Sequence, residues 1–144
     1  MTKEEKDLLM VDLCRRLHYD VICQMSRDIE FPQGNSIIEV LSISGYEAFV
    51  NTMNCSATTP FFVKPYLRPM SSITDDEIKD LQKITCQFCF SRYDNLAYVG
   101  AADDGFCSVS EMEQILSYFN AHHFDYRGLI EKGLALIAPN DMYK

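Results

Sequence analysis

One repeated pattern of residues marks three helix starts in this chain. In each case Thr or Ser is followed three positions later by Glu: Thr2 with Glu5, Thr74 with Glu77, and Ser108 with Glu111. In such a capping box the hydroxyl accepts a hydrogen bond from the backbone N–H of the glutamate, whose carboxylate accepts one from the backbone N–H of the hydroxyl residue. We therefore predict helices that begin next to Thr2, Thr74 and Ser108.

Apolar residues at helical spacing follow each box. The three stripes are Leu9, Leu13 and Leu17, flanked by Val11 and Cys14; Ile78, Leu81, Ile84, Thr85 and Phe88; and Met112, Ile115, Leu116 and Phe119. Steps of three and four residues place such side chains on one face of a helix. The second helix should run to about Phe88 or Phe90. The charged residues of the first helix, Asp12 and Arg16 among them, are expected to face solvent.

Strand patterns fill most of the first half. Alternating or β-branched runs predict strands at 21–25, 36–43, 46–51 and 60–64, with a tight hairpin at Ser44-Gly45. Pro65 and Pro69 are expected to end extended structure, because proline lacks the N–H that a strand donates. Residues 51–59 and 94–106 are predicted to be irregular.

The patterning changes from strands to helices near Met70. We therefore predict an α+β fold in which an N-terminal helix and a small antiparallel sheet, residues 1–70, pack against a mainly helical half, residues 71–144. A chain of 144 residues can bury a core as one domain. Two subdomains that share an interface stay open as an alternative, and no pattern specifies an oligomeric state.

The net charge of −8 argues against nucleic acid as a partner, because no excess of Lys or Arg exists to contact phosphates. A basic protein surface, or simple solubility, fits an acidic chain better. No apolar run approaches the ~18 residues of a membrane span, and no apolar stretch follows the charged N-terminus. We expect a cytoplasmic protein that does not contact membranes, with its six cysteines reduced.

Cys86 and Cys89 form a CxxC motif, a spacing that can ligate zinc or exchange with a disulfide. Zinc would need further ligands, for which Cys107, His122 and His123 are the candidates. The motif falls inside the predicted second helix and has no second copy, so buried cysteines that act as small hydrophobes are the expectation. No cofactor, metal or catalytic residue is assigned. A small metal-dependent or Cys/His-based enzyme is kept as the alternative to a non-enzymatic protein.

Two segments, 64–74 and 121–133, combine aromatic, charged and turn-forming residues at predicted joints between elements. The candidate interaction surface consists of Tyr66, Arg68, Met70, His122, His123, Tyr126 and Arg127. The first three alternate along an extended, proline-bounded stretch, which is the shape of a peptide or partner contact.

A structural interpretation of the same residues is favoured. In it Tyr66 and Leu67 fill the core, and Arg68 pairs with the acidic surface. Two exposed imidazoles bond the last carbonyls of the third helix, and Asp125 caps a short helix at 126–132 that Gly133 ends.

Three segments of the chain resemble known sequences. Residues 12–17 (DLCRRL), 64–72 (KPYLRPMSS) and 120–135 (NAHHFDYRGLIEKGLA) resemble a group of small uncharacterised proteins encoded by phages and integrated elements of gut bacteria. The resemblance spans the chain, with residues 24–59 and 91–107 its divergent part. No activity, cofactor or catalytic residue is attached to that group. The resemblance implies a phage or prophage accessory role inside a bacterial cell, with a host or phage protein as partner.

Overall fold

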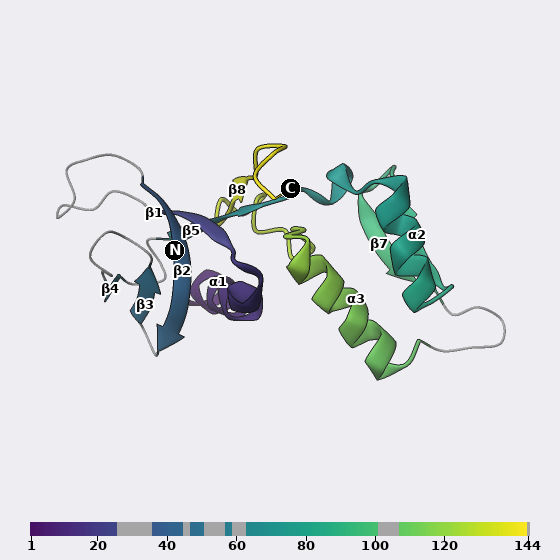
Figure 1. Cartoon of the computed structure of the whole chain (residues 1–144), viewed down its shortest axis with the longest axis horizontal. Helices are drawn as coiled ribbons and strands as arrows, with labels where there is room; N and C mark the ends of the chain where they lie inside the picture. The colour runs from purple at the N-terminus through teal and green to yellow at the C-terminus, as the bar shows by residue number, and fades with distance from the viewer. Residues whose placement is uncertain (26–35, 45–46, 51–56, 59–62, 101–106, 144) are drawn as a thin grey trace. The chain divides into compact units, whose positions relative to one another are not determined.

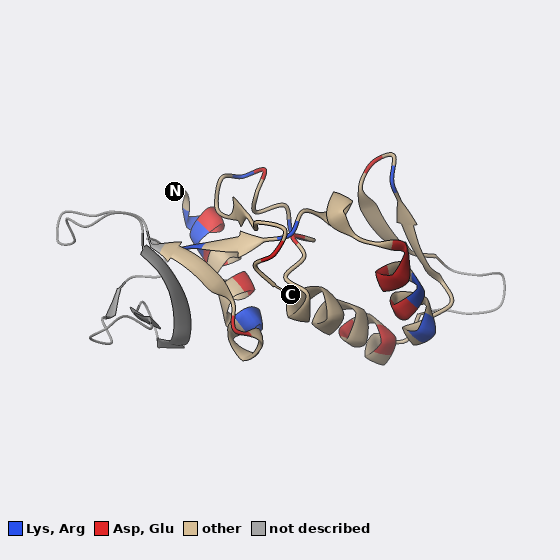
Figure 2. Cartoon of the chain, turned by 45° about the horizontal axis from the view of Figure 1, so that its top comes forward, with Lys and Arg blue, Asp and Glu red and all other residues tan. Residues whose placement is uncertain are grey.

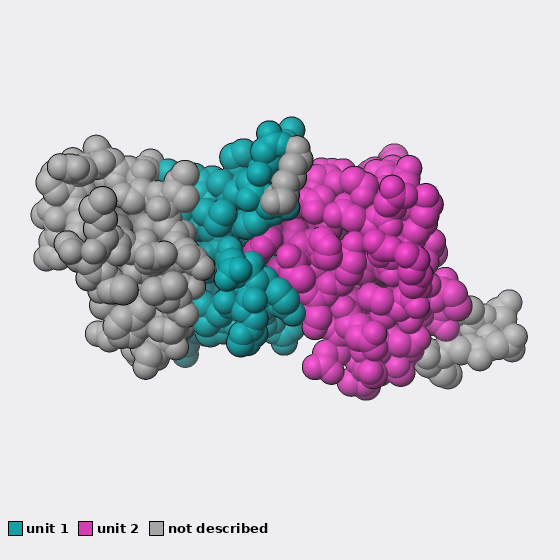
Figure 3. Space-filling view, viewed as in Figure 1, with its two compact units in different colours: residues 1–67, 128–144 teal, residues 68–127 magenta. Residues whose placement is uncertain are grey.

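The computed structural model describes residues 1–25, 36–44, 47–50, 57–58, 63–100 and 107–143 (Figure 1). The fold is α+β, as predicted. The chain divides into two compact units, coloured separately in Figure 3: unit 1 comprises residues 1–67 and 128–144, and unit 2 comprises residues 68–127. The change of pattern near Met70 thus lies beside one boundary, but the last segment of the chain belongs with the first and not with the helices between them.

Unit 1 opens with helix α1, Lys3–Arg16, which begins at the first capping box. The Thr2 hydroxyl accepts from the Glu5 N–H at 3.2 Å, and the Thr2 N–H donates to the Glu5 carboxylate at 2.7 Å. A short 3-10 helix, η1 (Leu17–Tyr19), extends α1.

One face of α1 differs from the prediction. Asp12 and Arg16 are buried, with side chains 0% exposed, and form an ion pair. Val11 and Cys14 are exposed instead. The buried face of α1 therefore includes a charged pair, which helical spacing alone assigned to solvent.

Unit 1 also contains a six-stranded sheet. Its strands are β1 (Ile22–Met25), β2 (Ser36–Ser44), β3 (Glu47–Val50), β4 (Ala57–Thr58), β5 (Val63–Leu67) and β8 (Leu136–Ile137). The spatial order is β4-β3-β2-β1-β5-β8. All neighbours are antiparallel except β5 and β8, so the sheet is mixed where an antiparallel one was predicted. The predicted β2–β3 hairpin is confirmed, although its turn at residues 45–46 lies outside the described residues.

Strand β5 continues through Pro65, which was predicted to end it. Val63, Pro65 and Leu67 are buried in alternation, and Pro65 lies opposite Cys23 of β1. Pairing of β5 with β8 begins only at Tyr66. The backbone N–H that Pro65 lacks is therefore not needed for a hydrogen bond to β8. A strand can hold proline at such a position, and burial of its ring favours the extended chain.

The core of unit 1 joins the helix, the sheet and the C-terminal segment. Its buried members are Leu9, Leu13, Val21, Cys23, Val63, Leu67, Leu129, Leu134 and Ala135. The Tyr143 hydroxyl donates to the Tyr66 carbonyl at 2.8 Å and accepts from the Ile22 N–H at 3.2 Å. Burial raises the pKa of Tyr143 well above its usual value. The tyrosine thus fastens the end of the chain to β1 and β5.

The predicted helix at 126–132 is wrong, because this segment forms turns. Gly128 has φ +69, a left-handed conformation that interrupts a right-handed helix. The expected ending is nevertheless present: Gly133 has φ +68, and the Leu134 N–H donates to the Leu129 carbonyl at 2.9 Å. This hydrogen bond and the left-handed glycine are typical of a helix C-terminus, although here a turn and not a helix precedes them.

Unit 2 holds two capped helices and a hairpin. Its elements are η3 (Met70–Ser72), α2 (Asp75–Ile84), β6 (Phe88–Ser91), β7 (Leu96–Val99) and α3 (Val109–Ala121). The capping boxes at Thr74 and Ser108 are both formed. Strands β6 and β7 pair antiparallel with Phe88 opposite Val99 and Phe90 opposite Ala97, and these four residues pack into the core of unit 2.

Two sequence predictions for this region are wrong. Helix α2 ends at Ile84, not near Phe88, because Thr85 is extended with φ −144° and the chain turns into β6. Residues 96–99, expected to be irregular, form β7, while 101–106 lie outside the described residues. Phe88 and Phe90 point inward with a period of two, which is the period of a strand. None of the described helices is long and apolar enough to cross a membrane.

Candidate functional site

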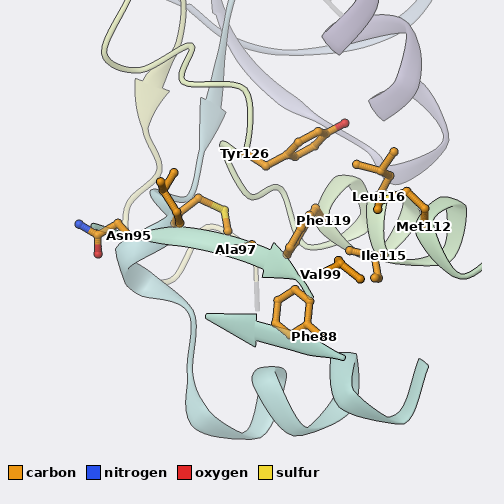
Figure 4. Close-up of a pocket in the computed structure, with 11 residues that line it drawn as sticks. Phe88, Asn95, Ala97, Val99, Met112, Ile115, Leu116, Phe119 and Tyr126 are labelled. Carbon is orange, nitrogen blue, oxygen red and sulfur yellow. The ribbon is translucent and has the colours of Figure 1, made fainter. Parts of the chain in front are cut away.

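A cavity of about 300 Å³ opens in unit 2 between the β6–β7 hairpin, helix α3 and the segment that follows α3 (Figure 4). Its lining is Met70, Phe88, Asn95, Leu96, Ala97, Val99, Met112, Ile115, Leu116, Phe119 and Tyr126. Nine of these eleven side chains are apolar. The size lies at the lower end of the range of ligand pockets, and an apolar lining is typical of them.

Phe119 is the centre of an aromatic cluster beneath the cavity. Its ring lies 6.1 Å from that of Phe88, 6.0 Å from Phe124 in an edge-on arrangement, and 5.6 Å from Tyr126 in a stacked one. Aromatic pairs at these separations contribute about 0.5–1.5 kcal/mol each beyond the area they bury. The wall of the cavity is therefore formed by interlocked rings before any ligand binds.

Helix α3 supplies the second wall. Ile115 and Phe119 are buried as the sequence predicts, whereas Met112 is 39% exposed and Leu116 is only half-buried. The helical stripe that indicated a core thus divides into two parts. Its inner residues pack in the core of unit 2, and its outer residues line an open cavity.

Tyr126 is held in place by polar contacts. Its hydroxyl donates to the Asn120 side chain at 3.2 Å and accepts from the Arg127 Nε at 3.1 Å, while the Arg127 guanidinium lies 4.9 Å from the ring centre. Figure 4 shows the hydroxyl directed away from Phe119. The ring of Tyr126 therefore lines the cavity, while its hydroxyl group forms hydrogen bonds with Asn120 and Arg127.

Exposed apolar residues occur on β7 and α3, and two of them, Leu96 and Met112, line the cavity. Leu96 is 52% exposed, Tyr98 45% and Val109 87%, in addition to Met112. Val109 and Met112 are neighbours on α3 because they are three residues apart. Tyr98 alternates with the lining residues Ala97 and Val99 and therefore lies on the other face of β7. Apolar side chains that gather around an open pocket are typical of interaction sites, unlike single scattered ones.

The two segments singled out by the sequence meet within unit 2 at Arg68. Its N–H donates to the His123 carbonyl and its carbonyl accepts from the Asp125 N–H, both at 2.8 Å. Its guanidinium bonds both carboxylate oxygens of Glu77, at 2.7 and 3.1 Å, and lies 4.2 Å above the Phe124 ring. Arg68 thus joins the start of α2 to the end of α3, in agreement with the structural interpretation of this residue.

The two histidines occupy different surroundings. The His122 Nδ1 lies 2.9 Å from the Tyr118 carbonyl and its ring stacks on Tyr118 at 3.9 Å, so it bonds a last carbonyl of α3 as predicted. His123 was expected to be exposed but is buried, with a backbone φ of +57°. Asp125 is also buried and precedes a turn, so its predicted role as a helix cap is wrong.

The structure separates the seven residues of the predicted interaction surface. Met70 and Tyr126 line the cavity, and Arg127 supports Tyr126. Arg68 forms backbone hydrogen bonds with the segment that follows α3, which contains His122 and His123. Tyr66 belongs to unit 1. Of the cavity lining, sequence reasoning named only Met70 and Tyr126 as site candidates. It assigned the lining residues of α3 to the core and missed those of β7. The alternation from Leu96 to Val99 was the signal that could have found them.

The cysteines are more exposed than predicted. Cys14, Cys86 and Cys89 are exposed and Cys107 is half-buried, whereas Cys23 is buried. Burial, with the nearby Asp12 carboxylate as a lesser cause, raises the pKa of the Cys23 thiol far above its usual value. Within the part of the chain that the structure describes, no three His, Cys, Asp or Glu side chains gather into a metal-binding group. The metal-dependent alternative stays a prediction.

Glu77 should make the stability of unit 2 depend on pH. Burial raises the pKa of its carboxyl, but hydrogen bonds from Arg68 and Thr74 together outweigh this and hold the pKa below its ordinary 4.5. A lowered folded-state pKa gives stability that is present above the unfolded value and is lost as pH falls through the folded one. We expect Glu77→Gln to cost about 1 kcal/mol at pH 7 and to lose less stability than the wild type between about pH 5 and pH 3.

Thermal melts followed by far-UV circular dichroism at several pH values measure this effect. Glu131→Gln, which changes an exposed carboxylate in a turn of unit 1, is the matched control and should melt like the wild type. Parallel curves of melting temperature against pH for Glu77→Gln and the wild type would show that the Arg68–Glu77 pair contributes nothing.

Comparisons with known proteins do not assign a function to this site. Protein-family models, curated proteins and solved structures contain no match to the chain.

Proposed function

We propose that this is a non-enzymatic accessory protein that acts by binding another protein through unit 2. The docking face consists of the cavity, its exposed lining residues Leu96 and Met112, and Val109, which lies one helical turn from Met112. The observation that carries the proposal is an open apolar cavity whose lining includes side chains as exposed as Leu96, at 52%, and Met112, at 39%.

The energetics of such a face favour a protein partner. Transfer of one large apolar side chain from water into the cavity would contribute about 1.5–3 kcal/mol. Covering the surrounding residues adds apolar area and excludes water, as in the centre of protein interfaces. Because Phe119 and Tyr126 already pack against each other, little side-chain entropy is lost when the cavity is filled.

The setting of this activity rests on the resemblance of residues 12–17, 64–72 and 120–135 to proteins of phages and integrated elements. It supports a phage or prophage accessory role in the cytoplasm of a bacterial cell, with a host or phage protein as the partner. The acidic charge of −8 supports a partner other than nucleic acid or an anionic membrane.

Affinity capture from a bacterial lysate with matched variants tests the proposal. Met112→Lys places a charge at the edge of the cavity, on a residue that is 39% exposed, so the fold should tolerate it. Val11→Lys makes the same kind of change on a residue of α1 that is 45% exposed and belongs to unit 1.

We expect at least one protein to be captured by the wild type and by Val11→Lys and to be reduced at least tenfold with Met112→Lys. Circular dichroism melts should show that both variants remain folded. If the two folded variants capture the same proteins in equal amounts, the docking face is excluded and binding belongs to another surface.

A further inference from the structure

The basic residues of unit 2 are already engaged. The segment 68–127 contains ten acidic and five basic residues, a net charge of −5. Four of the basic side chains form ion pairs: Arg68 with Glu77, Lys79 with Asp76, Lys83 with Asp80, and Arg92 with Asp75. The fifth, Arg127, lies on the ring of Tyr126. All four acidic residues of α2 are thereby matched by a cation.

Three carboxylates that neighbour lining residues in the sequence have no such match. Asp94, Glu111 and Glu113 form no ion pair with Lys or Arg within the described ranges. Asp94 precedes the lining residue Asn95, and the two glutamates stand on either side of the lining residue Met112 in the sequence of α3. Helix α3 carries no Lys or Arg, and Figure 2 shows its acidic residues near its N-terminal end.

Two of these carboxylates are kept ionised by local hydrogen bonds. Asp94 has a lowered pKa because it accepts from Ser91 and Tyr98, and Glu111 has one because it accepts from the backbone and hydroxyl of Ser108. Such bonds orient the carboxylates but leave their negative charge in place. Three carboxylates without an ion pair thus lie one residue from side chains that line an apolar cavity, whereas the guanidinium of Arg127 lies over the ring of the lining residue Tyr126.

We infer that the docking face binds a basic, amphipathic segment of its partner, in which one large apolar side chain enters the cavity and Lys or Arg residues on either side lie against Asp94, Glu111 and Glu113. This inference rests on the proposed function and adds the chemistry of the partner. Charge complementarity of this kind gives an interface its specificity and speeds association.

The same charges disfavour two other occupants. A second copy of this chain would bring a net charge of −8 against the same carboxylates, and like charges that face each other across an interface are costly. An anionic lipid surface would be repelled in the same way. A peptide segment with one apolar anchor also suits a cavity of about 300 Å³ that opens at the surface.

Three synthetic peptides serve as probes with the full-length protein. The first has one Phe flanked by two Lys on each side, the second replaces that Phe with Ala, and the third replaces the Lys residues with Glu. Titrations followed by methyl chemical shifts in NMR spectra report binding at Met112, Ile115 and Leu116, which line the cavity.

We expect the Lys-flanked Phe peptide to shift these methyl signals with an affinity that falls as salt is added, because Asp94 and Glu113 are exposed and Glu111 is partly exposed. The Ala peptide and the Glu-flanked peptide should each bind at least tenfold more weakly. Glu113→Gln should weaken the first peptide by up to about fivefold, the range of one exposed ion pair, while the control Glu4→Gln on α1 should not change it.

The outcomes separate this inference from the proposed function. If the Lys-flanked and Glu-flanked peptides bind the methyl groups equally, or if salt has no effect, the basic partner is excluded but the apolar docking face stands. If the Lys-flanked peptide shifts no cavity methyl, the inference is overturned, and capture with Met112→Lys decides the docking face independently. Binding that Met112→Lys leaves unchanged would also overturn it.

Discussion

Asp12→Asn should destabilise unit 1 by about 3–5 kcal/mol, the typical cost of breaking a buried ion pair by removal of one partner. The Arg16 Nε donates to one Asp12 carboxylate oxygen at 2.7 Å and a terminal guanidinium nitrogen donates to the other at 3.0 Å. Both side chains are 0% exposed. The amide keeps the shape of the carboxylate but removes the negative charge that lies against the buried guanidinium.

Urea unfolding and hydrogen exchange at the amides of α1 and β1 would measure this loss. Asp7→Asn, on an exposed residue of the same helix, is the control and should change stability by less than about 0.5 kcal/mol. The double variant Asp12→Leu/Arg16→Met should recover most of the loss, because apolar replacement of a whole buried pair is often neutral or better. An Asp12→Asn protein as stable as the wild type would show that the pair is not closed in solution.

Phe119→Ala should destabilise unit 2 by about 3–5 kcal/mol, the usual cost of truncating a buried Phe. The ring is 3% exposed and packs against Phe88, Phe124 and Tyr126. Its removal leaves a void beside a cavity that already exists, and the three remaining rings lose their common neighbour. We therefore expect the loss to fall at the upper end of this range.

Hydrogen exchange at the amides of α3, β6 and β7 would report this change for unit 2 alone. Val109→Ala, on an 87% exposed residue of the same helix, is the control and should leave protection within about 0.5 kcal/mol of the wild type. If Phe119→Ala reduced protection no more than Val109→Ala, the aromatic cluster would not be the core of unit 2. Phe119→Leu should lie between the two, because it restores part of the lost volume.

On α1 the sequence predicts the burial of two leucines correctly and the burial of two charged residues wrongly. Leu9 and Leu13 were predicted to be buried and are. Asp12 and Arg16 were assigned to solvent because a charge inside a protein is costly unless it is paired. Because they are four residues apart, the two side chains can pair whether their side of the helix is buried or exposed to solvent. Only the position of α1 on its sheet decides that the pair is buried.

Asp125 and Phe88 illustrate the same limit at element ends. Asp125 is a suitable N-cap residue, but Gly128 is left-handed and the chain forms turns. Phe88 continues the apolar spacing of α2, yet it also fits the alternation of β6, and pairing with Val99 decides for the strand. Where two periodicities fit the same residue, the partner that buries it determines the element.

The helix starts at Thr2, Thr74 and Ser108 follow from local sequence, because the hydrogen bonds of each capping box join residues three apart. The β2–β3 pairing across a short turn also follows from local sequence. Tertiary structure alone decided that β8 returns to β5, that Arg68 joins Glu77 to Phe124, and that Met112 and Tyr126 face one cavity. These contacts join residues far apart in the chain, and their free energy arises only when the separate elements have packed together.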